Sequence, residues 1–188
     1  MMWQLPTSVD ISGKKYNITN ECDYQVVLDC INALNDDELD FESQITCALI
    51  IFYEEHEEIL SLDKEHIITA IKEMNNIING GVEEQNKKNQ KPIVDFVKDF
   101  SLIATALIQI LGYDIRTPNK YTHWWTFLSA FKEIKSGFYY TVLQIRLKIS
   151  KGISLDKQEQ HFYSENFDII EIKQKFTKEE EEFFSLFE

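Results

Sequence analysis

The residues best suited to metal binding or proton transfer are four histidines, and their spacing favours neither role. A two-metal site in a helical bundle pairs a Glu with a His three positions later, and only Asp63-x-x-His66 approaches that spacing. The zinc motif H-E-x-x-H, the glycine-rich phosphate loops and the G-x-S-x-G nucleophile motif are not in the sequence. The sequence therefore predicts no catalytic residues, no metal site, no cofactor and no enzymatic activity.

The most unusual pattern is the aromatic run His-Trp-Trp-Thr-Phe at residues 123–127. Adjacent residues on a helix point about 100° apart, so Trp124 can face a core while Trp125 lies near its rim. Tryptophan is also enriched at the centres of protein interfaces. Two interpretations stay open: packing of a helical core, or a protein-binding surface made by His123, Trp124, Trp125 and Phe127.

The last residues combine four consecutive glutamates, 179–182, with Phe183, Phe184 and Phe187. The preceding Thr177-x-x-Glu180 has the spacing of a capping box at a helix start. This acidic-aromatic segment is predicted either as a docked helix or as a mobile arm that becomes ordered on a partner. In both cases its three phenylalanines are candidate protein-binding residues.

The charge balance limits the kinds of partner. The chain of 188 residues has 19 basic and 32 acidic side chains, a net charge of −13. That sign argues against binding nucleic acid or an anionic membrane surface, where Lys and Arg supply the affinity. The longest apolar stretch, residues 102–111, is far shorter than the ~20 residues of a membrane span. The three cysteines lack C-x-x-C spacing, which fits reduced thiols in a cytoplasm. The N-terminus also lacks the basic cluster and apolar segment of a signal peptide.

Hydrophobic periodicity predicts a mainly α fold, a bundle of about six to seven helices with a small N-terminal β-hairpin. Alternating apolar residues around Gly13 indicate strands at 8–12 and 15–19. Helical spacing follows at 24–34, 41–52, 67–78, 92–111, 121–135, 138–151 and 155–174. The helix after Pro92 is apolar on most sides, which predicts a place at the centre of the bundle. The acidic run 54–58 is interpreted as a solvated helix end with a break before Ser61.

The predicted organisation has three parts. Residues 1–19 form the hairpin, residues 20–165 form the bundle with a polar loop at 82–91, and residues 166–188 form the acidic-aromatic arm or helix.

Several motifs together resemble the gene-product-fifteen family of tailed bacteriophages and prophages of Gram-positive hosts. The opening reads Leu5-Pro6-x-Ser8-Val9-x-Ile11-x-Gly13-Lys14-x-Tyr16-x-Ile18. Further matches are Asn79-Gly80-Gly81, Asp95-Phe96-x-x-Asp99 and Tyr121-x-His123-Trp124-Trp125-x-Phe127-Leu128. The resemblance spans residues 3–165, and the His-Trp-Trp-x-Phe signature is its most specific part.

Genes of that family usually lie between those for the major tail protein and the tape measure protein. The resemblance therefore implies a tail assembly chaperone in the host bacterial cytoplasm that keeps the tape measure protein soluble. The major tail protein, another tail chaperone or a second copy of the chain are further candidate partners. The alternative is a structural virion component, a connector or tail terminator subunit. The resemblance supplies no catalytic residue.

Overall fold

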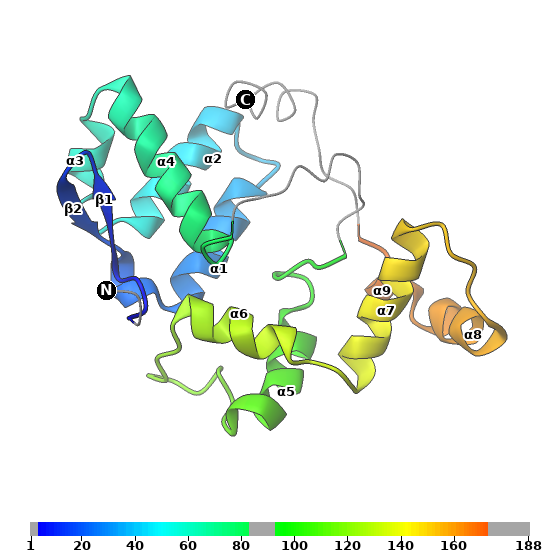
Figure 1. The fold of residues 1–188 in the computed structure, drawn as a ribbon. Coiled ribbons are helices and arrows are strands. Elements are labelled where there is room, and N and C mark those ends of the chain that lie inside the picture. Colours follow the sequence, from blue (N-terminus) through cyan, green and yellow to red (C-terminus); the bar gives the residue numbers. More distant parts are fainter. Residues whose placement is uncertain (1–3, 83–92, 173–188) are drawn as a thin grey trace. The chain divides into compact units, whose positions relative to one another are not determined.

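The computed structural model describes residues 4–82 and 93–172, and its architecture confirms the predicted class: a mainly helical protein with an N-terminal hairpin (Figure 1). The described chain divides into two compact units. Unit 1 holds residues 4–82 and 117–130, and unit 2 holds residues 93–116 and 131–172. The predicted three-part division, with limits after residues 19 and 165, stays a prediction.

The elements follow the predicted hydrophobic periods closely. Unit 1 contains β1 (Ser8–Ile11), β2 (Lys14–Asn17), a 3-10 turn (Thr19–Cys22), α1 (Tyr24–Leu34), α2 (Phe41–Phe52), α3 (His56–Leu60), α4 (Lys64–Ile78) and most of α6 (Trp124–Lys132). Unit 2 contains α5 (Phe100–Leu111), α7 (Phe138–Ser150), α8 (Lys157–Glu165) and α9 (Phe167–Ile170). Within these described segments, no helix has the length and hydropathy needed to cross a bilayer.

The hairpin forms where the alternating residues predict it. β1 and β2 pair antiparallel, with Val9 opposite Tyr16, and both of these side chains are buried. The turn places Ser12 and Gly13 at φ values of 54° and 88°, in the left-handed region that the primed hairpin turns require. The Gly13 amide donates to the Asp10 carboxylate over 2.8 Å, which closes the turn.

The acidic run at 54–58 attaches this hairpin to the helices. Glu55 accepts hydrogen bonds from the backbone and side-chain nitrogens of Asn17 at 2.8 and 2.9 Å. Glu58 accepts a hydrogen bond from the Tyr16 hydroxyl at 3.0 Å and pairs with Lys14. The interpretation as a purely solvated helix end was therefore incomplete, because two of the four glutamates bind the hairpin. The predicted break is present, since α3 ends at Leu60.

Several predicted helices start or end differently, and the helix expected at 121–135 is the shorter α6 (Trp124–Lys132). The described part of the helix expected from Pro92 begins only at Phe100, because the Asp95 carboxylate accepts from the amides of Val97 and Lys98 and holds a turn there. Pro92 itself lies outside the described residues. The helix expected at 155–174 is interrupted at Asn166, between α8 and α9.

Candidate functional site

The aromatic run at 123–127 lies at the centre of unit 1. Trp124 and Phe127 are fully buried, with ring centroids 5.1 Å apart and stacked planes. Phe127 stacks in turn on Tyr24 of α1 at 5.5 Å. The Trp124 indole nitrogen donates to the carbonyl of Ile78 over 2.8 Å and so satisfies the end of α4. These two side chains hold α1, α4 and α6 together, as the core-packing interpretation predicts.

His123 is also buried, and its two ring nitrogens have fixed roles. Nε2 lies 2.9 Å from the carbonyl of Pro6, and Nδ1 lies 3.0 Å from the backbone nitrogen of Trp125. A carbonyl can only accept and an amide can only donate, so the ring is the neutral tautomer with its proton on Nε2. Burial lowers the pKa of His123 below its usual 6.5. The imidazole therefore connects the N-terminal residues to α6 as an uncharged group.

The depressed pKa of His123 predicts how stability changes with pH. The unfolded chain takes up this proton near pH 6.5, whereas the folded protein takes it up only at lower pH. The contribution of neutral His123 is thus complete above pH 6.5 and is lost as the pH falls through the depressed folded pKa. We expect the stability advantage of wild type over His123→Asn to shrink between pH 7.5 and 5 in urea unfolding. A pH-independent difference would contradict this prediction.

Trp125 is half-buried and covers the last turn of α4. Its indole nitrogen donates to the Ile77 carbonyl over 3.0 Å. A Cβ atom on Gly81, where φ is +73°, would lie 3.0 Å from the indole ring. Glycine at this position therefore allows both the left-handed turn and the close approach of the ring.

The structure thus places four of the seven candidate binding residues within unit 1. His123, Trp124 and Phe127 are enclosed by it, so only Trp125 presents part of its side chain to solvent. Phe183, Phe184 and Phe187 lie outside the described residues. A protein-binding role for all seven stays a prediction, and the packing of the three enclosed side chains gives them a structural role.

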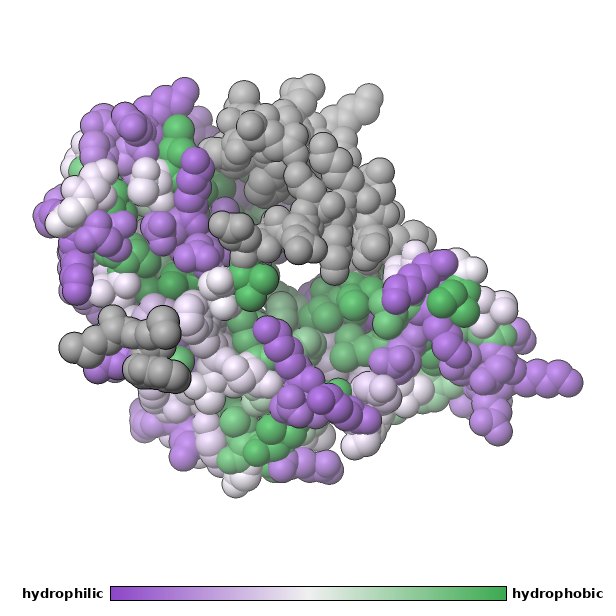
Figure 2. All heavy atoms as spheres, viewed as in Figure 1, coloured by the Kyte–Doolittle hydropathy of each residue, from purple (hydrophilic) through white to green (hydrophobic). Residues whose placement is uncertain are grey.

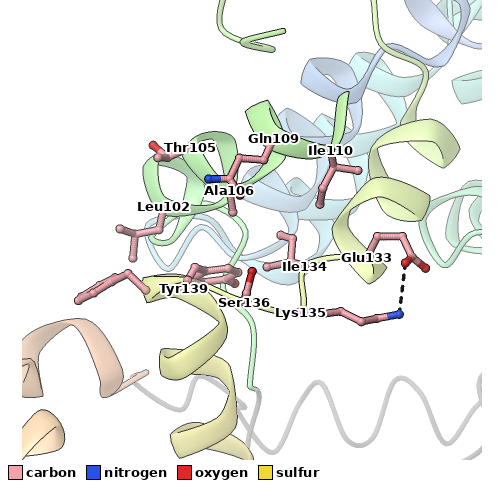
Figure 3. A pocket seen from close by; sticks show the side chains of 12 residues that line it. Leu102, Thr105, Ala106, Gln109, Ile110, Glu133, Ile134, Lys135, Ser136 and Tyr139 are labelled. Carbon is pink, nitrogen blue, oxygen red and sulfur yellow. Dashed lines mark hydrogen bonds and ion pairs between the residues drawn. The ribbon is translucent and has the colours of Figure 1, made fainter. Parts of the chain in front are cut away.

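Unit 2 carries an apolar groove that the sequence did not reveal (Figure 3). Leu102, Ala106 and Ile110 are four residues apart on α5, so they share one face of the helix. They line the groove on one side, and the segment 133–139, which includes Ile134 and Phe138, lines the other. We call this hollow, of about 210 Å³, the α5 groove.

The sequence explained the apolar residues of α5 by a covered position at the centre of the bundle, whereas part of them line the open α5 groove. The apolar residues on most sides of this helix predicted a place at the centre of the bundle. One face is buried, with Ile103, Ala104 and Leu107 fully enclosed, but Ile110 is 39% exposed and Phe138 across the groove is 43% exposed. Figure 2 shows hydrophobic residues at the surface where α5 lies. The excess of apolar residues on α5 was a usable signal, but periodicity alone cannot distinguish an open apolar face from a covered one.

The size and lining of the groove suit the binding of apolar side chains, because its floor is apolar and its polar groups are neutral or already paired. Thr105, Gln109 and Ser136 contribute neutral polar groups, and Glu133 and Lys135 form an exposed ion pair of 3.2 Å. Pockets for small molecules and cofactors usually measure 300–1,000 Å³, so a hollow of about 210 Å³ fits one or two side chains of a peptide better than a cofactor.

A buried ion pair holds the two sides of the groove in place. Arg146 of α7 and Asp99, just before α5, form two hydrogen bonds and are 4% and 1% exposed. The hydroxyl of Tyr139, whose ring lines the groove, donates to Asp99 over 3.2 Å. Burial raises the pKa of this hydroxyl well above its usual range, so it acts as a neutral donor.

The remaining candidate chemistry has structural explanations. The His66 ring forms a 2.7 Å hydrogen bond with the Asp63 carboxylate, which lowers the pKa of Asp63. The same carboxylate caps α4 by accepting from the His66 backbone amide over 3.1 Å. Cys22, Cys30 and Cys47 are free thiols, and burial raises the pKa of Cys22 to about 12. Among residues 4–82 and 93–172, no three potential ligands gather into a metal site.

The fold and groove define a mainly helical protein with an N-terminal hairpin and an apolar groove on its second unit. The family model described as Bacteriophage Gp15 protein matches residues 1–175, nearly the whole chain. The chain belongs to this bacteriophage family, as the motifs predicted, and the family points to a phage structural or morphogenesis protein. No curated protein and no solved structure matches the chain significantly.

Proposed function

We propose that this protein is a tail assembly chaperone that binds the tape measure protein in the host bacterial cytoplasm and keeps it soluble. The family supports a role in phage structure or morphogenesis. The observation that carries the finer proposal is the α5 groove, where Ile110 and Phe138 expose apolar surface. The buried pair of Asp99 and Arg146 joins the elements on its two sides. No bond is made or broken in this function.

The need for an apolar groove comes from the protein that the chaperone keeps soluble, here called its client. A tape measure protein is a long helical chain, and its apolar stripes stay exposed until tail-tube subunits cover them. Exposed stripes of this kind drive aggregation. An apolar groove can cover the side chains of an amphipathic helix at spacings of three and four residues. A net charge of −13 helps to keep the resulting complex dispersed.

Ile110→Asp should abolish this protection. A carboxylate at the floor of the groove must lose its hydration when an apolar side chain binds over it, which should weaken binding at least ~10-fold. The test is co-expression with a fragment of the tape measure protein from the same phage, followed by the amount of soluble fragment that co-purifies. The control is Ile153→Asp, at a residue that is 51% exposed and does not line the groove. Equal yields with both variants would contradict the assignment of the groove.

Mass spectrometry of purified virions tests the alternative of a connector or tail terminator subunit. A chaperone leaves the assembled tail, so its peptides should be missing from particles in which the major tail protein is abundant. Stoichiometric recovery of this protein from particles would favour the structural component.

A further inference from the structure

The described chain ends at a fixed place in unit 2. Arg146 donates to the carbonyl of Ile170 at 2.8 Å, and the Lys98 ammonium donates to the carbonyls of Asp168 and Glu171 at 2.7 and 2.6 Å. Cations at the last carbonyls of a helix are favourable, and here they fix α9 against α7 and the start of α5. The last described residues therefore lie beside Lys98, one residue before the N-cap of α5.

The chain beyond this point is long enough to follow the groove. α5 has 12 residues and is about 18 Å long. Residues 173–188 span about 24 Å even at the short rise of a helix, and more when extended. The groove lies along α5, so the 16 residues that follow the described chain are long enough to span it.

The composition of the last residues complements the groove. Phe176, Phe183, Phe184 and Phe187 provide large apolar side chains, and glutamates occupy positions 179–182. The groove offers an apolar floor, and Lys135, which pairs with Glu133, lines the side formed by the α6–α7 connection. Exposed Lys132, the last residue of α6, lies three positions earlier in the chain. On the same side Gly137 is the N-cap of α7, and its lack of a side chain leaves the positive end of the helix without a side-chain cap.

We propose that the acidic-aromatic segment, residues 176–187, binds the α5 groove of its own chain and is displaced by the client. Aromatic side chains would cover Ile110 and Phe138, and the glutamates would lie toward Lys132 and Lys135. Self-binding shields the groove before a client is available, and it keeps client affinity modest enough for release. The displacement part rests on the proposed function, whereas the self-binding part does not.

Photo-crosslinking of the full chain tests the self-binding. Phe184 is replaced with p-benzoylphenylalanine, the protein is irradiated at low micromolar concentration, and the crosslinked peptides are mapped. We expect crosslinks within single chains to residues 102–110 and 133–139. Ile110→Asp should reduce them about tenfold, and Ile153→Asp should leave them unchanged. The same probe at Phe167, an exposed residue of α9, is the positional control and should give no groove crosslinks.

The outcomes separate this inference from the proposed function. Crosslinks between two copies, crosslinks only to unit 1 or no crosslinks would overturn self-binding. Addition of the tape measure fragment should reduce the intramolecular crosslinks several-fold, and an undiminished yield with the fragment bound would overturn displacement. Failure of the fragment to bind at all would count against the proposed function, while the crosslinks without fragment would still establish self-binding.

Discussion

Arg146→Leu should lower the free energy of unfolding by about 3–5 kcal/mol, the largest effect expected in unit 2. The substitution leaves the Asp99 carboxylate buried without its counter-ion, and a buried uncompensated charge is among the costliest defects in a fold. It also removes the donors to the carbonyls of Ile93, Ile169 and Ile170. The start of α5, α7 and α9 would lose their common anchor.

Urea unfolding of purified variants measures this effect. The control is Lys135→Leu, which removes an exposed ion pair and should cost less than about 1 kcal/mol. The double variant Asp99→Leu, Arg146→Leu removes both charges and should be more stable than Arg146→Leu alone, because no unpaired charge remains. If the double variant were the less stable of the two, the destabilisation would come from lost packing and not from the orphaned carboxylate.

Trp124→Ala should have an effect of similar size in unit 1. Truncating a fully buried tryptophan costs about 3–5 kcal/mol through lost burial and the cavity left behind. Here the change also removes the stacking on Phe127 and the hydrogen bond to the Ile78 carbonyl. Thermal and urea unfolding should show a less stable protein, with loss of the near-ultraviolet signal of the packed aromatic rings.

Two further variants separate the causes. Trp124→Phe retains a ring in the core but lacks the indole donor, so it should cost about 1–3 kcal/mol. Trp125→Ala truncates a half-buried ring and should destabilise less than Trp124→Ala. A larger loss for Trp125→Ala would show that covering the end of α4 matters more than filling the core.

Local sequence patterns predicted the elements well because those elements are determined locally. The alternating residues around Gly13 produced the hairpin, and the stripes at 24–34 and 41–52 produced α1 and α2 with those bounds. The spacing of Trp124 and Phe127 places them on one side of a helix, since there are 3.6 residues per turn. That spacing left core packing and protein binding both open, and the structure shows both side chains fully buried. Belonging to the bacteriophage family also followed from motifs readable in the sequence.

The features that escaped prediction depend on segments distant in the chain. The role of Glu55 and Glu58 requires the hairpin 38–44 residues earlier. The pairing of Asp99 with Arg146 joins positions 47 residues apart, and the α5 groove opens only because the connection 133–139 lies along one face of α5. Single-sequence periodicity shows which faces are apolar, but not which neighbour covers them or leaves them open.

Unit 1 is assembled from residues 4–82 and 117–130, so it cannot be completed on the ribosome until the second stretch has been synthesised. Trp124, Phe127 and the His123 contact with Pro6 are supplied by residues made long after α4. At about 5–20 residues per second, the nascent hairpin and first four helices wait roughly 2–9 s for them. During that interval the apolar faces later covered by α6 are exposed, so the yield of folded protein should depend on how well those faces are protected from aggregation.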